Sequence, residues 1–184
     1  MVLTKYITIS YITIMNYRTG AVLIACLSCG VSAQTREHAE ASIVLHLPAP
    51  PSVVFPLFGP VRESEWAPHW NPTILYPLDR SQKAGMVFTT GHHGQDEVWV
   101  LTTYDETALQ IKYVIVSEGQ NAAQLDISLK GIGEKETEAT VTHRLTSLSE
   151  AGDGFVKDFA GQFPLERDHW EHAISARLRE LMRP

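Results

Sequence analysis

The chain has 184 residues, enough for one domain and a short leader. Its hydrophobic share of 44% and charged share of 20% are those of an ordinary globular protein. The formal net charge is −6 and lysine and arginine form no cluster, which argues against a nucleic-acid partner.

The first 33 residues differ in kind from the rest of the chain. They contain two basic residues, Lys5 and Arg18, and no acidic residue, and an apolar run follows at 21–27. Small residues at 31–33 then precede Gln34, and this order is typical of a secretory signal peptide. The apolar run is much shorter than the roughly 20 residues that cross a bilayer. We therefore predict an exported protein, periplasmic or secreted, without a stable membrane span.

Two features of this leader leave alternatives open. Met15 offers a second start, because residues 15–33 would make a compact leader by themselves. Residues 23–26 also match the lipid-attachment box of bacterial lipoproteins, which would anchor the protein at Cys26. We favour a signal peptide at 1–33, a lead-in at 34–40 and a folded domain at 41–184. Both cysteines then leave with the leader, so the mature chain has no disulfide or thiolate.

The domain begins with a strand and two short helices. Residues 41–47 alternate between apolar and polar, which predicts a strand that the following prolines end. Pro51 suits a first helical turn, and Pro56 limits that helix to about two turns. A second short helix is predicted at 61–65, before an irregular segment at 66–72.

The middle of the chain reads as one antiparallel meander. Strands are predicted at 73–78, 86–90, 97–104, 109–115, 125–129 and 139–145, joined by polar or glycine-containing turns. Most of them alternate, so one face of the sheet should be exposed to water. The strand at 97–104 is apolar on both faces, which predicts a central position in the sheet.

The end of the chain is helical. Phe155, Phe159 and Phe163 recur every fourth residue, and Gly152 or Asp153 could cap this segment. Pro164 is predicted to begin a new amphipathic helix that runs to the end of the chain. The fold class is therefore α+β, with an antiparallel sheet and a long C-terminal helix.

The order of these elements, with APPSVVF at 49–55 and WAPHWNP at 66–72, resembles the START-like (SRPBCC) superfamily, which includes polyketide cyclase/dehydrase-type proteins. The resemblance covers about residues 41–182. It implies a helix-grip fold, in which a curved antiparallel sheet wraps around the long C-terminal helix, with two short helices after the first strand. It also implies an apolar cavity between sheet and helix, with residues 47–72 at its rim. These proteins share no universal catalytic residue, so function has to be argued from the site.

His143 is the strongest candidate for a polar contact in such a cavity. It alternates in step with Val141 and Leu145 along the predicted strand, so its side chain should face the interior as theirs do. It would then be either a hydrogen-bonded core histidine or a ligand contact or general base. The aromatic residues are core by default, but some could line the cavity. The candidate ligand-binding residues are Trp66, Trp70, Trp99, Tyr113, His143, Phe159 and Phe163.

Other patterns predict no chemistry. No phosphate-binding loop or nucleophile elbow occurs. His92 and His93 suggest a solvated loop, and Asp96 and Glu97 suggest a solvated strand start. We predict no metal, no cofactor and no assigned catalytic residue.

Two functions remain at this stage. The first is an exported protein that binds a small apolar molecule, lipid-like or polycyclic, in the cavity. The second is a polyketide cyclase/dehydrase-like enzyme in which His143 or Tyr113 moves a proton. The sequence leaves the ligand, the presence of catalysis and the oligomeric state open.

Overall fold

The computed structural model describes residues 35–92 and 95–183. The predicted signal peptide, with its cleavage after Ala33, lies outside the described residues. So do the side chains of the histidine pair at 92–93.

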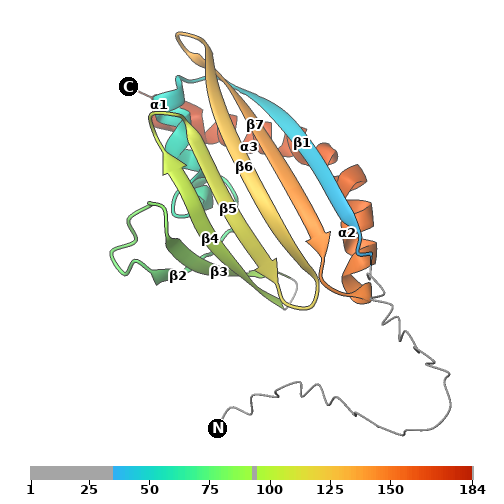
Figure 1. The fold of residues 1–184 in the computed structure, drawn as a ribbon. Coiled ribbons are helices and arrows are strands. Elements are labelled where there is room, and N and C mark those ends of the chain that lie inside the picture. Colours follow the sequence, from blue (N-terminus) through green and yellow to red (C-terminus); the bar gives the residue numbers. More distant parts are fainter. Residues whose placement is uncertain (1–34, 93–94, 184) are drawn as a thin grey trace, which may run out of the picture. The chain divides into compact units, whose positions relative to one another are not determined.

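Seven strands in the described part of the chain form one antiparallel sheet in the order β1-β7-β6-β5-β4-β3-β2 (Figure 1). The strands β2 to β7 follow one another as a meander, and β1 returns to pair with β7. Their bounds are β1 His38–Leu47, β2 Thr73–Tyr76, β3 Met86–His92, β4 Gln95–Asp105, β5 Gln110–Ser117, β6 Asn121–Gly133 and β7 Glu136–Ser147. The predicted antiparallel meander is confirmed.

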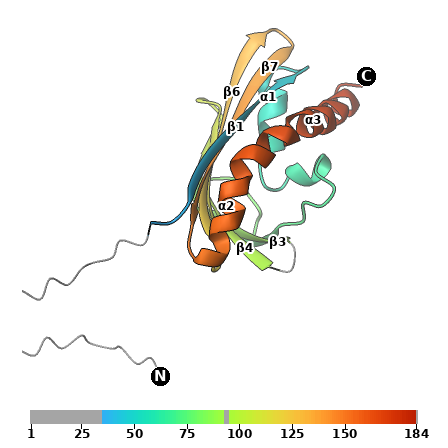
Figure 2. The same ribbon diagram turned by 90° about the vertical axis from the view of Figure 1, so that its right-hand side faces the viewer.

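The sheet has one covered face and one open face. The helices lie on its concave side (Figure 2), and strands β1 and β5 alternate strictly between buried and exposed side chains. Strand β4, which contains the segment predicted at 97–104, lies inside the sheet between β3 and β5, so its predicted central position is confirmed. Val98 is 41% exposed because none of the described elements covers the outer face of the sheet, where Val98 pairs with Val116 of β5.

Strand β1 is longer than predicted. It begins at His38 rather than Ala41, because Ala39 continues the inward row and pairs with Leu145 of β7. Residues 38–40 of the predicted lead-in at 34–40 therefore belong to the sheet.

The segment after β1 holds the short helices. They are α1 Pro51–Val54, which begins with proline, and the 3-10 turns Phe55–Phe58 and Glu63–Glu65. Two tryptophans fix the segment through their ring nitrogens. Trp66 Nε1 donates to the carbonyl of Leu57 at 2.7 Å, and Trp70 Nε1 donates to the carbonyl of Pro60 at 2.7 Å.

The C-terminal helix lies against the concave face (Figure 2). It consists of α2 Glu150–Gln162, a 3-10 turn at Phe163–Glu166 that contains Pro164, and α3 Arg167–Leu181. With the curved sheet it makes the helix-grip arrangement. Proline cannot supply an interior helical hydrogen bond, which explains the 3-10 turn between the two helices.

The start of α2 differs from the prediction. Its N-cap is Ser149, whose hydroxyl accepts from the Gly152 amide at 3.2 Å. Gly152 lies one turn further on and has a different role. A Cβ there would lie 2.0 Å from the carbonyl oxygen of Gln120, so only glycine lets α2 approach the β5–β6 turn this closely.

Candidate ligand-binding cavity

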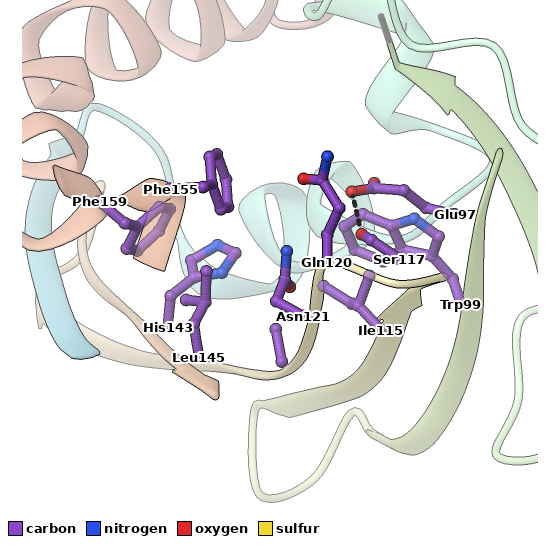
Figure 3. A pocket seen from close by; sticks show the side chains of 11 residues that line it. Glu97, Trp99, Ile115, Ser117, Gln120, Asn121, His143, Leu145, Phe155 and Phe159 are labelled. Carbon is purple, nitrogen blue, oxygen red and sulfur yellow. Dashed lines mark hydrogen bonds between the residues drawn. The ribbon is translucent and has the colours of Figure 1, made fainter. Parts of the chain in front are cut away.

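A cavity of about 600 Å³ lies between α2 and one end of the sheet. It is bounded by the ends of β4, β5, β6 and β7 that meet near the β5–β6 turn, and by two phenylalanines of α2 (Figure 3). Its lining is Glu97, Trp99, Ile115, Ser117, Gln120, Asn121, Ala123, His143, Leu145, Phe155 and Phe159. Phe155 is 49% exposed and therefore marks an edge where the cavity meets solvent.

The register of the sheet places the inward side chains of this end in rows across the strands. The outermost row is polar and is called the polar row here; its members are Thr90, Glu97, Ser117, Asn121 and Ser147. The next row is apolar and consists of Phe88, Trp99, Ile115, Ala123 and Leu145. His143 belongs to the third row, opposite Leu125. The cavity thus has a polar end and an aromatic and aliphatic body.

Glu97 is the charged group of the polar end. Its Oε1 accepts from the Ser117 hydroxyl at 2.8 Å, and its Oε2 accepts from the Thr90 hydroxyl at 3.4 Å. Thr90 Oγ1 in turn accepts from Trp99 Nε1 at 2.9 Å. Each of the two carboxyl oxygens thus accepts one hydroxyl hydrogen bond. Among the described residues, no cation pairs with this carboxylate.

Two amides stand between Glu97 and His143 (Figure 3). Asn121 is only 5% exposed, and its amide points into the cavity without a hydrogen-bond partner among the described residues. Gln120 comes from the turn before β6 and also reaches into the space. Among the described residues no fully buried side-chain nitrogen or oxygen lacks a partner, so the amide atoms of Asn121 are open to the cavity, where a ligand or water can bind them.

His143 lines the opposite side of the cavity. Its ring packs against Phe163, with centroids 4.7 Å apart, and against Phe159 at 5.4 Å. Burial lowers the pKa of His143 from 6.5 to about 4, so the imidazole is neutral at neutral pH. No described residue hydrogen-bonds to it, which leaves one ring donor and one ring acceptor for a ligand.

The structure brings only some of the predicted ligand-binding residues to the cavity. Trp99, His143 and Phe159 line it, and Phe163 lies just behind them against His143. Their contact with a ligand stays a prediction.

Of the other predicted residues, Trp66 and Tyr113 are buried in the core, and Trp70 is half-buried against it. Trp66 and Trp70 use their ring nitrogens on backbone carbonyls of the short-helix segment. Tyr113 is 3% exposed, and its hydroxyl donates to the carbonyl of Phe58 at 2.9 Å. Burial, with Glu63 nearby, raises the pKa of Tyr113 well above its usual range. None of these three lines the cavity, and neither does any residue of 47–72, so the predicted rim lies elsewhere.

The sequence analysis missed the polar row. Glu97 was predicted to be a solvated strand start, whereas it contributes to the cavity wall. The alternation of side chains along each strand could have indicated this, because Glu97 lies on the same face of β4 as Trp99, and Ser117 lies on the same face of β5 as Ile115. Asn121 needed the register of β6, since it lies outside the predicted strand at 125–129.

Two further observations concern the described residues. They contain no group of three or more histidine, cysteine, aspartate or glutamate side chains placed to hold a metal ion. None of their helices combines the length and the apolar character that a membrane span requires.

Solved structures of the same fold are found at low sequence identity. A START superfamily protein from Mycobacterium smegmatis superposes with a TM-score of 0.59 at 17% identity, covering 79% of this chain and 100% of that one. The Zhui aromatase/cyclase from Streptomyces sp. R1128 gives a TM-score of 0.59 at 12% identity, with 80% of this chain and 97% of that one covered. Norcoclaurine synthase from Thalictrum flavum gives 0.58 at 12% identity, covering 93% and 99%.

No protein-family model matches the sequence, and a comparison with curated proteins finds no significant match. At these identities the structural likeness establishes the fold, which is the helix-grip fold of the START-like (SRPBCC) proteins. The resemblance inferred from the sequence is confirmed at that level.

Proposed function

We propose that the protein is an exported carrier that binds one small apolar or amphipathic molecule in the cavity between α2 and the sheet. The observation that carries this proposal is the cavity itself, about 600 Å³ with an aromatic and aliphatic body and few polar groups. Sites of this size and composition are typical of small-molecule binding.

The packing of the domain supports the same function. Protein interiors are normally close-packed, and the side chains around an unfilled space lose dispersion contacts. Here large side chains such as Phe88 and Leu101 are fully buried, whereas the space beside Ala123 is left open. An apolar ligand there would restore the missing contacts.

Two adjacent alanines of β6 provide a matched test. Ala123 faces the cavity, and Ala122 faces the open side of the sheet. The purified protein is titrated with N-phenylnaphthylamine, an uncharged fluorescent probe. Ala123→Phe fills the cavity and should weaken binding about tenfold or more, which corresponds to about 1.4 kcal/mol. Ala122→Phe should bind like the wild type.

Native mass spectrometry of protein from its own host gives the second test. A co-purifying small molecule that Ala123→Phe excludes would support the carrier. A wild-type protein that binds neither the probe nor any host molecule would overturn it. The same spectra test export, since a mature chain should begin at Gln34, whereas an acylated Cys26 would indicate the lipoprotein alternative.

An enzyme of the cyclase/dehydrase type is the second candidate, and His143 favours it. A neutral imidazole without a described partner beside a cavity could act as a general base. Two structural neighbours are named as an aromatase/cyclase and as norcoclaurine synthase. If the protein cyclises a polyketone substrate, His143→Gln should abolish turnover while probe binding persists. Unchanged turnover would exclude this role.

A further inference from the structure

We propose that the ligand of this cavity carries a protonated amine on an aromatic or polycyclic body, with Glu97 as its counter-ion and Asn121 as a second polar contact. This inference rests on the proposed binding function and specifies its ligand class. It starts from the polar row, which no sequence pattern singled out.

The charge of the cavity wall is one-sided. Among the described residues, its lining contains one carboxylate, Glu97, and no lysine or arginine. His143 adds no positive charge at neutral pH, because burial lowers its pKa to about 4. A ligand with a carboxylate or phosphate group would therefore meet a negative wall and no counter-charge. This wall disfavours fatty acids and other anionic lipids.

Glu97 is also held in one position without being neutralised. Ser117 and Thr90 each donate a hydroxyl hydrogen bond to it, and Trp99 orients the threonine. Hydroxyl donors fix the direction of a carboxylate but leave its charge in place. A partly buried carboxylate with no cation beside it among the described residues is costly, and a ligand cation that pairs with it lowers that cost.

Asn121 adds an independent observation to the same end of the cavity. The Asn121 amide has no hydrogen-bond partner among the described residues, although the residue is only 5% exposed. Asn121 lies in the polar row two strands from Glu97, which is on the order of 10 Å between Cα atoms. Both side chains point into one space from the same wall (Figure 3).

The rest of the wall fits the body of such a molecule. Trp99, Phe155 and Phe159 line the space with aromatic surface, and Ile115 and Leu145 form an aliphatic floor. A flat ring system would occupy this part, while its amine reaches the polar row. The proposed ligand thus combines an apolar body with one cationic end.

Three probes of the same shape test the charge preference. Naphthylethylamine, naphthylethanol and naphthylacetate share a two-ring body and differ in one cationic, neutral or anionic end. Their affinities for the full chain are measured by isothermal titration calorimetry at neutral pH. We expect the amine to bind about tenfold tighter than the alcohol, and the carboxylate to bind more weakly than both.

Two variants assign the preference to Glu97. Glu97→Gln should reduce the amine-to-alcohol ratio to near unity. Glu118→Gln is the matched control, because it removes an exposed carboxylate from the adjoining turn that does not line the cavity. Its ratio should stay that of the wild type.

The outcomes separate this inference from the binding function. If all three probes bind equally to the wild type, or if the carboxylate binds best, the amine preference is refuted and the cavity remains a binding site. If Glu97→Gln retains the wild-type ratio, Glu97 is refuted as the counter-ion. If the wild type binds none of these probes and no N-phenylnaphthylamine, the proposed binding function itself fails. The amine-to-alcohol affinity ratio of the wild type tests the amine preference even if the Glu97→Gln variant does not fold.

Discussion

Replacing His143 should change how the stability of this protein depends on pH. The ring lies against Phe159 and Phe163 at the cavity wall, and burial lowers its pKa from 6.5 to about 4. The folded state therefore binds this proton more weakly than the unfolded chain does. The neutral His143 ring therefore adds its full share to the free energy of unfolding above about pH 6.5, and this share is lost as the pH falls towards about 4.

The magnitude follows from the two pKa values. At about 1.4 kcal/mol per pKa unit, a decrease from 6.5 to about 4 amounts to about 3 kcal/mol. This is an upper bound, because the ring borders a cavity that water can enter. His143→Gln removes the titrating group. The free energy of unfolding of the wild type should therefore fall relative to the variant by up to about 3 kcal/mol between about pH 7 and pH 4.

Urea denaturation followed by tryptophan fluorescence at several pH values measures this difference. His143→Phe is the matched control, since it also removes the titrating group but replaces it with an apolar ring. The two variants can differ in absolute stability, yet both should show the same pH dependence relative to the wild type. A difference between wild type and variants that stays constant over this range would refute the desolvated, neutral histidine. A wild type that gains stability relative to both variants on acidification would show a charged His143 with an unrecognised partner.

Three more predictions test the fold around the site. Burial raises the pKa of Glu63 from 4.5 to about 8, so its favourable contribution to stability is present below about pH 4.5 and lost as the pH rises through about 8. In urea denaturation, the free energy of unfolding of Glu63→Gln should therefore rise relative to the wild type by roughly 2–4 kcal/mol between about pH 5 and pH 9. The same difference between variant and wild type at both pH values would contradict this. Gly152→Ala should lower the melting temperature, because its Cβ would lie 2.0 Å from a backbone oxygen, whereas Gly154→Ala in the same helix meets no atom within 4 Å and should stabilise by up to about 1 kcal/mol. Tyr113→Phe should cost roughly 1–2 kcal/mol of stability, since it leaves a buried carbonyl unpaired, but should leave N-phenylnaphthylamine affinity unchanged; weaker binding would place Tyr113 at the ligand after all.

The local pattern of the sequence determined most of the fold. Alternation along each strand predicted the antiparallel meander, and proline positions predicted the short helices and the interruption at Pro164. Alternation also predicted the inward direction of His143, because parity depends only on neighbours within one strand. These properties are local, so they can be read from the chain without knowing what packs against it.

Tertiary structure decided where the cavity lies and which polar groups enter it. The tryptophans at 66 and 70 looked like rim residues, but their ring nitrogens bind backbone carbonyls of their own segment. Glu97, Ser117 and Asn121 come from three strands, and only the cross-strand register unites them in one row. That register, and the close approach of α2 that Gly152 allows, depend on contacts between residues far apart in the chain. A single sequence shows which way each side chain points, but which side chains meet is settled by how the strands and helices pack.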